Sequence, residues 1–277
     1  MSSGVLRVID VGRATTIQDH GRRGWAHLGV PTAGAVDRSA HDLVNRLVGN
    51  PADAATIETL GGMTVEAVRP TVVARSTDGS RHTLVTGARL RLDPAPGRVW
   101  AYLAVRGGID AMPVLGSRSH DTLSGLGPPP VTDGATLHAG PDPRTDLDTD
   151  LAPDRRVDRA IRLWPGPHES WFEGGRSSLT THGWTVTSDS SRVGVRLVAA
   201  AFERTALAEV NVASFGLVEG AIQITPSGEP IVMMANHPTT GGYPVIAVVD
   251  PLDVGFLAQS PPGTSLRFVD AALMHPG

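Results

Sequence analysis

The stretch IVMMANHPTTGGYPVIAVV, from Ile231 to Val249, contains two apolar runs rich in β-branched residues on either side of a polar loop with two glycines. Runs of this kind, bounded by turn residues, predict two β-strands joined by a loop. Similar short runs recur along the whole chain, and some alternate polar with apolar residues, as Arg89-Leu90-Arg91-Leu92 does. The sequence therefore predicts a mainly β fold with closely spaced strands, as in a sandwich or a barrel.

Helices are predicted to be few and short. In residues 37–48 the apolar side chains recur at i, i+3, i+4, i+7 and i+8, which places them on one face of a helix. Asp37 is positioned to cap the first turn, and Gly49-Asn50-Pro51 ends the helix. Residues 252–259 are a weaker helical candidate. With so few helices between strands, a doubly wound parallel sheet is disfavoured.

The chain is predicted to divide near its middle. Residues 141–158 are rich in Asp, Arg and Pro and contain few apolar side chains, so they bury little surface. We therefore predict an N-terminal β-rich half over residues 1–145 that contains the amphipathic helix, a linker over 146–158, and a C-terminal β-rich half over 159–277. A length of 277 residues is compatible with two domains of ordinary size.

Composition excludes several kinds of chemistry. The chain has no Cys, which excludes thiolate catalysis, iron–sulfur clusters and Cys-based zinc sites, and all 24 of its Lys and Arg residues are Arg. Without Lys it contains no phosphate-binding P-loop, no Schiff-base lysine and no attachment site for biotin. A net charge of −4 argues against nucleic acid and anionic membranes as partners. No apolar run has the length of a signal peptide or a membrane span, so a cytoplasmic location is expected.

The loop inside the opening stretch is the sharpest candidate site. His237, Thr239 and Thr240 are predicted to act in catalysis, and Asn236, Gly241, Gly242 and Tyr243 to bind substrate. The glycines can turn backbone N–H groups outward into a nest that suits a carboxylate, a phosphate or a developing oxyanion. The alternative is a decorated hairpin, in which the threonines only satisfy the hydrogen bonds of the turn.

Other polar positions extend the candidate set. Gln18, Asp19 and Arg22 lie in a glycine-punctuated loop, where Arg22 can clamp a carboxylate; the alternative is an Asp–Arg surface pair that fixes a bend. Arg192 can reach an anionic ligand or be solvated, and Gln223 completes the substrate-binding candidates. No metal site is predicted, because the ten His are scattered and Phe172 replaces the second His of a zincin-like motif that begins at His168. No serine triad is predicted either.

A series of motifs follows along the chain: Thr16-Ile17-Gln18-Asp19, Gly21-Arg22-x-Gly24, His27-Leu28-Gly29-Val30-Pro31, Gly34-x-x-Asp37, Asn45-Arg46-Leu47-Val48-Gly49-Asn50, Tyr102-Leu103-Ala104-Val105-x-Gly107-Gly108-Ile109-Asp110, Val114-Leu115-Gly116-Ser117-Arg118-Ser119, Pro165-Gly166-Pro167-His168, Ser191-Arg192-x-Gly194, Thr239-Thr240-Gly241-Gly242-Tyr243-Pro244 and Leu257-Ala258-Gln259. From end to end, this series resembles the allophanate hydrolase subunit 2 family, also called KipA or the C subunit of 5-oxoprolinase. Three positions depart from the family pattern: Asn236 replaces an Asp, Ser191 replaces an Asn, and residues 57–62 are one residue short. Asn236 therefore cannot serve as a carboxylate base.

The resemblance implies two barrel-like halves with a cyclophilin-like fold and a KipI-like partner, the allophanate hydrolase subunit 1. It implies a complex, together with a third subunit, that opens 5-oxoproline to glutamate with ATP, while this chain alone binds no cofactor. One alternative is carboxyl transfer in a biotin-dependent, urea-type carboxylase, with carboxybiotin delivered by another protein. A second is a non-catalytic antagonist of a KipI-like kinase inhibitor. Literal allophanate hydrolysis of the Ser–Ser–Lys type is excluded because the chain has no Lys.

Overall fold

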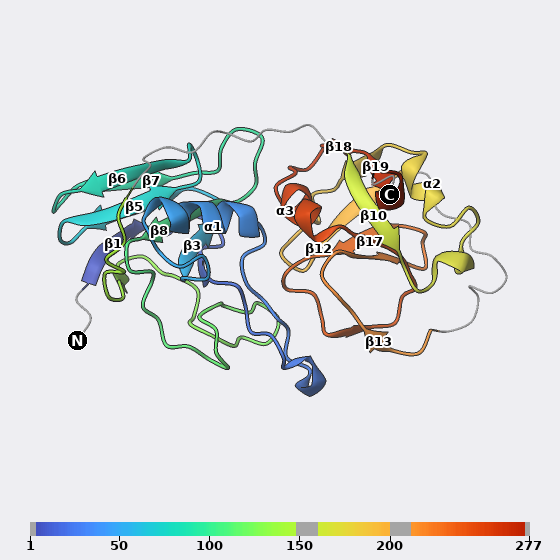
Figure 1. Ribbon diagram of the computed structural model, residues 1–277, viewed down its shortest axis with the longest axis horizontal. Coiled ribbons are helices and arrows are strands. Elements are labelled where there is room, and N and C mark those ends of the chain that lie inside the picture. Colours follow the sequence, from blue (N-terminus) through green and yellow to red (C-terminus); the bar gives the residue numbers. More distant parts are fainter. Residues whose placement is uncertain (1–3, 148–159, 200–211, 275–277) are drawn as a thin grey trace. The chain divides into compact units, whose positions relative to one another are not determined.

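The computed structural model describes residues 4–147, 160–199 and 212–274, and the chain forms two compact units (Figure 1). Unit 1 comprises Met1–Gly24 and Thr32–Arg156, and unit 2 comprises Trp25–Pro31 and Val157–Gly277. Unit 2 thus includes a short segment from early in the sequence, Trp25–Pro31. A division of the chain at a single linker would assign that segment to the N-terminal half. Most of the linker predicted over 146–158 lies outside the described residues, and its boundaries stay a prediction.

Unit 1 is built from two antiparallel sheets. The four-stranded sheet has the order β7 (Arg89–Leu92), β4 (Met63–Ala67), β1 (Gly4–Asp10) and β9 (Thr136–His138). The five-stranded sheet has the order β2 (Thr16–Gln18), β3 (Thr56–Thr59), β8 (Ala101–Val105), β5 (Thr71–Arg75) and β6 (Ser80–Leu84). Apolar side chains from both sheets, among them Leu6, Met63 and Leu103, form one buried core. Burial of this shared core holds the two sheets together.

Helix α1 (Arg38–Leu47) lies over the five-stranded sheet, in contact with β8, β5 and β6 (Figure 1). Asp37 caps it as predicted, accepting a hydrogen bond from Ala40 N at 3.1 Å. The buried face is not purely apolar, because His41 and Asn45 are fully buried beside Val44. Asn45 Nδ2 donates to Ala54 O at 2.8 Å, which satisfies that side chain inside the fold. The other short helices are η1 (Ala26–Leu28), η2 (Glu169–Trp171), α2 (Ser177–Thr180), α3 (Pro251–Ala258) and η4 (Ala271–Met274).

Unit 2 is dominated by an eight-stranded sheet. Its order is β18 (Ser265–Leu266), β11 (Trp184–Val186), β12 (Gly194–Val198), β15 (Pro230–Met233), β14 (Ala221–Ile224), β17 (Val245–Val249), β10 (Ile161–Pro165) and β19 (Phe268–Asp270). Neighbouring strands are antiparallel except β10 and β19, which pair in parallel. A separate two-stranded ribbon joins β13 (Phe215–Gly216) to β16 (Thr240–Gly241). The mainly β fold with few short helices is confirmed.

The loop of the opening stretch is not a hairpin turn. Strands β15 and β17 are not neighbours, because β14 lies between them and pairs with both. The segment that connects them therefore crosses over β14 and contributes β16 to the ribbon on its way. The decorated-hairpin alternative is therefore wrong. Two apolar runs on either side of a glycine pair give no sign that a third strand, β14, lies between them in the sheet.

An ion pair fixes helix α3 to the large sheet. Arg162 Nε, in β10, donates to Asp253 Oδ2 at 2.8 Å, and the Arg162 backbone N–H donates to the same oxygen at 3.0 Å. Asp253, in α3, is fully buried, and this pairing satisfies its carboxylate. Among the residues that the structure describes, no helix has both the length and the apolar character needed to cross a bilayer.

Candidate functional site

The sequence-predicted residues fall in both units. Gln18, Asp19 and Arg22 belong to unit 1, and Arg192, Gln223 and the residues of the 236–243 loop belong to unit 2. The candidate residues therefore form two separate groups, one in each unit.

In unit 2, Arg192 and Asn236 form a buried pair. Arg192 precedes β12 and Asn236 follows β15, and the Asn236 backbone N–H donates to Arg192 O at 2.9 Å. Their side chains are also joined, because Arg192 Nε donates to Asn236 Oδ1 at 2.8 Å. Arg192 is 5% exposed and Asn236 is not exposed at all. The side chains thus meet because β12 and β15 are neighbours in the sheet.

Burial alters the chemistry of this arginine. It lowers the pKa of Arg192 to about 9, and the negative charge of Glu219 acts in the opposite direction. Arg192 therefore stays cationic at neutral pH, and its hydrogen-bond partner Asn236 contributes no charge. A buried guanidinium attracts carboxylates and other anions, and Glu219 is a carboxylate of the protein whose charge acts on it.

His237 lies next in sequence and is 7% exposed. Its Nδ1 is 2.7 Å from Pro238 O, a backbone acceptor, so we assign the ring proton of the neutral form to Nδ1. This assignment leaves Nε2 as the nitrogen that can accept a proton, as the predicted role in proton transfer requires.

The threonines and glycines lie on the ribbon. Thr240 pairs with Gly216 and Gly241 with Phe215, while Leu217 N donates to Thr239 O at 2.9 Å. Thr240 and Gly242 are exposed. Neither Gly241 nor Gly242 has the positive φ that a left-handed nest uses. The predicted glycine nest is therefore wrong: neither glycine has the φ that the nest needs, and Gly241 takes part in a strand.

Gln223 ties the ribbon loop to the sheet. It lies in β14, is 4% exposed, and its Nε2 donates to Tyr243 O at 2.9 Å. A Cβ added at Gly241 would lie 2.6 Å from the same nitrogen, closer than packed side chains allow. The glycine at position 241 thus lets the Gln223 amide approach the loop. The Tyr243 side chain itself is 44% exposed.

In unit 1, Asp19 is an anchor for residues 117–119. Its carboxylate accepts hydrogen bonds from Ser117 Oγ, Ser119 Oγ and Arg118 N, each at 2.6 Å, and from Gly21 N at 2.8 Å. Burial by itself raises the pKa of Asp19, but these hydrogen bonds outweigh it and hold the pKa below the ordinary value. Asp19 is therefore an ionised structural residue, and any contact with substrate stays a prediction.

Gln18 and Arg22 support the same part of unit 1. Gln18 Nε2 donates to His120 O at 3.1 Å, and Arg22 Nη2 donates to Ser119 O. Both residues are almost completely buried, so the alternative of an Asp–Arg surface pair is wrong. Within the described residues, Gln18 Oε1 and Arg22 Nη1 have no hydrogen-bond partner. These two atoms retain the capacity to bind a ligand, and their predicted role in substrate binding remains a prediction.

Sequence reasoning missed His168 as a member of the ribbon region. Its Nδ1 accepts a hydrogen bond from Val245 N at 3.2 Å, and its ring centroid is 4.8 Å from those of Trp171 and Phe215. Burial lowers the pKa of His168, which keeps the ring neutral at neutral pH. The sequence named His168 only in the Pro165-Gly166-Pro167-His168 motif and at the start of the rejected zincin-like motif.

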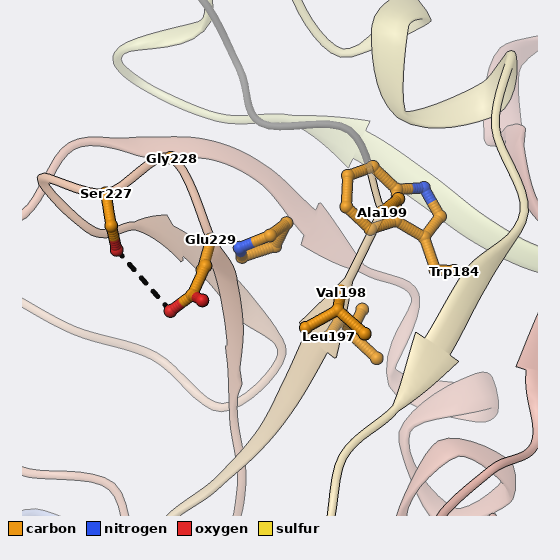
Figure 2. A pocket seen from close by; sticks show the side chains of 8 residues that line it. Trp184, Leu197, Val198, Ala199, Ser227, Gly228 and Glu229 are labelled. Atoms are coloured by element: carbon orange, nitrogen blue, oxygen red, sulfur yellow. Dashed lines mark hydrogen bonds between the residues drawn. The ribbon is translucent and has the colours of Figure 1, made fainter.

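A small pocket of about 130 Å³ opens elsewhere in unit 2 (Figure 2). Trp184 and Leu197 form part of its apolar wall, and Ser227 and Glu229 supply polar atoms. None of the predicted site residues lines it. The predicted site in unit 2 thus rests on the ribbon and the Arg192–Asn236 pair.

Similarity to known proteins agrees with this fold. The chain is 36% identical to the C subunit of 5-oxoprolinase from Escherichia coli, with 97% of this chain and 92% of the relative covered. It is 30% identical to the protein of the same name in Haemophilus influenzae, with 98% and 93% covered. A urea amidolyase of Lachancea kluyveri is 29% identical, and there the match covers 95% of this chain but only 17% of the relative.

Two solved structures share the fold over nearly the whole chain. The crystal structure of TTHA0988 superposes with a TM-score of 0.85 at 31% identity, covering 96% of this chain and 55% of that one. The urea carboxylase of Kluyveromyces lactis superposes with a TM-score of 0.87 at 26% identity, covering 98% and 28%. This chain thus spans about half of TTHA0988 and a smaller part of the urea carboxylase. The model of the carboxyltransferase domain, subdomains A and B, matches residues 28–270. The chain therefore belongs to the carboxyltransferase domain family, subdomains A and B.

Proposed function

We propose that this chain is the C-type subunit of an ATP-dependent 5-oxoprolinase complex and helps to bind a small lactam such as 5-oxoproline. The proposal is supported by 36% identity to a protein named as the C subunit of 5-oxoprolinase, with nearly the full length of both chains covered. A complex component of the hydrolase class fits a chain that has no Cys and no Lys. Such a chain lacks the P-loop lysine and the thiol with which many enzymes activate their substrates.

The observation that carries the proposal is the buried Arg192–Asn236 pair. In our proposal the Arg192 guanidinium, a buried cation that Asn236 holds in place, binds the substrate carboxylate. The side-chain hydroxyl of Thr239 or Thr240 stabilises charge on the lactam oxygen. His237 Nε2 carries a proton to or from the opening ring. Gln223 and Gly241 act as positioning residues that hold the loop on β14.

ATP is assigned to other members of the complex. In our proposal a KipI-like protein and a third 5-oxoprolinase-type protein supply the nucleotide site, and this chain binds no cofactor for that reaction. For Gln18, Asp19 and Arg22 we propose a role in ligand binding within unit 1. The absence of Lys from the sequence is the physical basis for placing ATP outside this chain.

The experiment reconstitutes the complex with both proposed partners and measures glutamate formation from 5-oxoproline in the presence of ATP. If Arg192 grips a carboxylate, Arg192→Ala is expected to lower kcat/KM by roughly 30-fold to 1000-fold, mainly through KM. Thr240→Val is expected to lower kcat. Arg196→Ala is the matched control, because Arg196 is an exposed arginine on the adjoining strand β12. Unchanged turnover after both Arg192→Ala and Thr240→Val would remove the site assignment.

A second candidate function is carboxyl transfer in a biotin-dependent, urea-type carboxylase. It is favoured by the match to the carboxyltransferase domain and by the identity to a urea amidolyase. The biotin would come from another protein, because this chain has no lysine to carry it. Streptavidin blotting of complexes pulled down with this chain separates the two candidates. A biotinylated carrier in the complex supports carboxyl transfer, and its absence together with 5-oxoproline turnover supports the oxoprolinase.

A further inference from the structure

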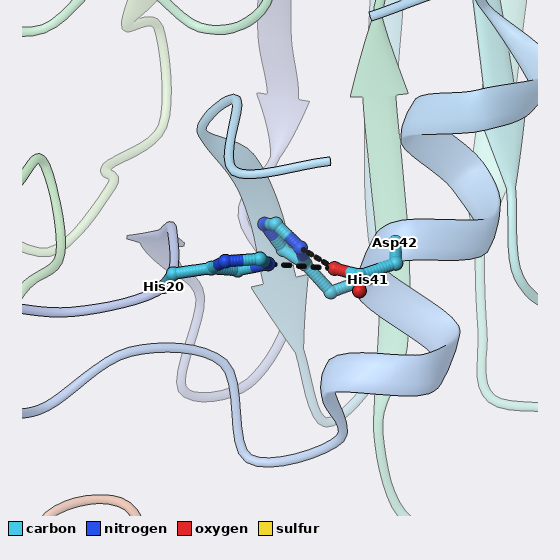
Figure 3. A group of neighbouring side chains, drawn as sticks. All are labelled: His20, His41 and Asp42. Atoms are coloured by element: carbon cyan, nitrogen blue, oxygen red, sulfur yellow. Dashed lines mark hydrogen bonds and ion pairs between the residues drawn. The ribbon is translucent and has the colours of Figure 1, made fainter. Parts of the chain in front are cut away.

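Three potential metal ligands converge in unit 1 (Figure 3). His20 follows β2, whereas His41 and Asp42 are consecutive residues of helix α1. His20 Nε2 is 2.7 Å and His41 Nδ1 is 3.1 Å from the same atom, Asp42 Oδ1. One ligand atom from each residue lies within 4.8 Å of the other two. Two imidazoles and a carboxylate therefore meet at one point.

The fold holds one of these ligands rigidly and leaves the other two open to water. His41 is fully buried, and its ring meets the Tyr102 ring edge-on at 6.2 Å between centroids. Tyr102 is itself fixed, because its hydroxyl donates to Glu58 Oε2 at 2.7 Å. The side chains of His20 and Asp42 are 33% and 32% exposed. A solvent ion can thus reach the cluster without opening the core.

The separations are close to those of a metal site. A tetrahedral zinc ion with ligands at about 2.1 Å places its ligand atoms roughly 3.4 Å apart. The His20–Asp42 and His41–Asp42 separations, at 2.7 and 3.1 Å, are slightly shorter. Small movements of the half-exposed His20 and Asp42 side chains would widen the cluster enough, while His41 stays in place.

We propose that His20, His41 and Asp42 form a binding site for a divalent transition-metal ion of the zinc class. Two imidazole nitrogens and one carboxylate oxygen suit Zn²⁺, Co²⁺, Ni²⁺ or Cu²⁺, whereas Mg²⁺ and Ca²⁺ prefer sites built from oxygen. The ion takes the place of the protons that otherwise lie between the imidazoles and the Asp42 carboxylate. Water fills the remaining coordination position. By bridging His20 to helix α1, the ion would fasten the segment after β2 to the helix.

The affinity is expected to be moderate. The site has three protein ligands, and His41 Nε2 finds no hydrogen-bond partner among the described residues. A hydrogen-bond acceptor for the second ring nitrogen of a ligating histidine commonly strengthens metal binding by about 10–100-fold. We therefore expect a Kd on the order of 1–10 µM for Zn²⁺, weaker than that of a four-ligand structural site.

The test uses the untagged full chain, stripped of metal with a chelator and titrated with Zn²⁺ by calorimetry. Co²⁺ serves as a second probe, since its visible absorption reports a tetrahedral site. Wild type is expected to bind one ion per chain, and His20→Gln and Asp42→Asn are each expected to weaken binding by at least about 10-fold. His182→Gln is the control, because His182 is an exposed histidine in unit 2. Zn²⁺ is also expected to raise the Tm of wild type more than that of His20→Gln.

The alternative is a hydrogen-bonded triad without metal, in which both imidazoles donate to Asp42. No Zn²⁺ binding to the wild type at concentrations up to about 100 µM would establish that alternative and overturn the proposal. Equal affinity in wild type, His20→Gln and Asp42→Asn would also overturn it, because the ion would then bind elsewhere. Circular dichroism confirms that each variant is folded. Since His20 and Asp42 are half-exposed, both variants are expected to fold.

Discussion

Replacing Gly241 by alanine tests the packing of the ribbon loop against the sheet of unit 2. The new methyl group would lie 2.6 Å from Gln223 Nε2 and 2.7 Å from Leu217 Cδ1. Both atoms end flexible side chains, so they can move. Gln223 is nevertheless 4% exposed and donates to Tyr243 O, and displacing it breaks a partly buried hydrogen bond. Loss of that bond and local overpacking together cost about 1–3 kcal/mol.

Gly242→Ala is the matched control. A Cβ at position 242 would have one neighbour within 4 Å, Val212 O at 3.9 Å, and the residue is exposed. Neither glycine has a positive φ, so alanine introduces no backbone strain at either position. Both substitutions also restrict the unfolded chain in the same way, and that effect cancels when the two variants are compared. The difference between them therefore reports the contact with Gln223 and Leu217.

The assay follows thermal and urea unfolding through the fluorescence of the five tryptophans, which include the buried Trp184 in β11 of unit 2. Gly241→Ala is expected to lower the Tm by roughly 3–10 °C relative to Gly242→Ala. In a double-mutant cycle, Gln223→Ala is expected to remove part of the penalty of Gly241→Ala. Equal stability of the two glycine variants, within about 0.5 kcal/mol, would refute the packing described for this loop.

Two further substitutions test buried charges. Asp19→Asn is expected to cost about 2–4 kcal/mol at pH 7, because the carboxylate accepts four hydrogen bonds. The folded state lowers the pKa of Asp19, so its stabilisation is complete above pH of about 4 and is lost as the pH falls through the folded-state pKa. Urea titrations from pH 7 to pH 3 should show the wild type losing stability more steeply than Asp19→Asn; parallel curves would contradict this expectation. Asp253→Asn is expected to cost about 3–5 kcal/mol, because it breaks a buried pair with Arg162. The control Arg89→Ala removes an ion pair of a 63% exposed arginine and is expected to change stability by less than about 1 kcal/mol. Similar losses in Asp253→Asn and Arg89→Ala, measured by urea denaturation, would count against the anchoring of α3.

The sequence predicted those strands and helices whose own residues show an apolar pattern or a capping residue. The alternating run Arg89–Leu92 forms β7, the second apolar run of the opening stretch forms β17, and α1 begins directly after the predicted cap Asp37. Strand β3 has no signal in its own residues, because three of the four residues in Thr56–Thr59 are polar and yet all four are buried. Glu58 is buried there through long-range hydrogen bonds, including one from Tyr102, and a local pattern does not contain such contacts.

The candidate site could be predicted in its residues but not in its arrangement. Arg192 and Asn236 were both named from the sequence, yet their contact depends on the pairing of β12 with β15. The ribbon partner of Gly241 is Phe215, and nothing near either residue in the sequence indicates that pairing. His20 meets His41 and Asp42 only because the segment after β2 lies beside α1. Sheet order and tertiary contact, rather than local propensity, decide these features.

The parallel pairing of β10 with β19 has a consequence for synthesis on the ribosome. Ile161 to Leu163, in the first strand of the large sheet, pair with Phe268 to Asp270, in its last strand. While the chain is still emerging, one edge of β10 stays uncovered until residues 268–270 have been synthesised. The sheets of unit 1 need nothing beyond β9, so they can close much earlier. During synthesis, unit 2 thus presents an unpaired strand edge for longer than unit 1 does. In that state a chaperone can bind the edge of β10, or a wrong strand can pair with it.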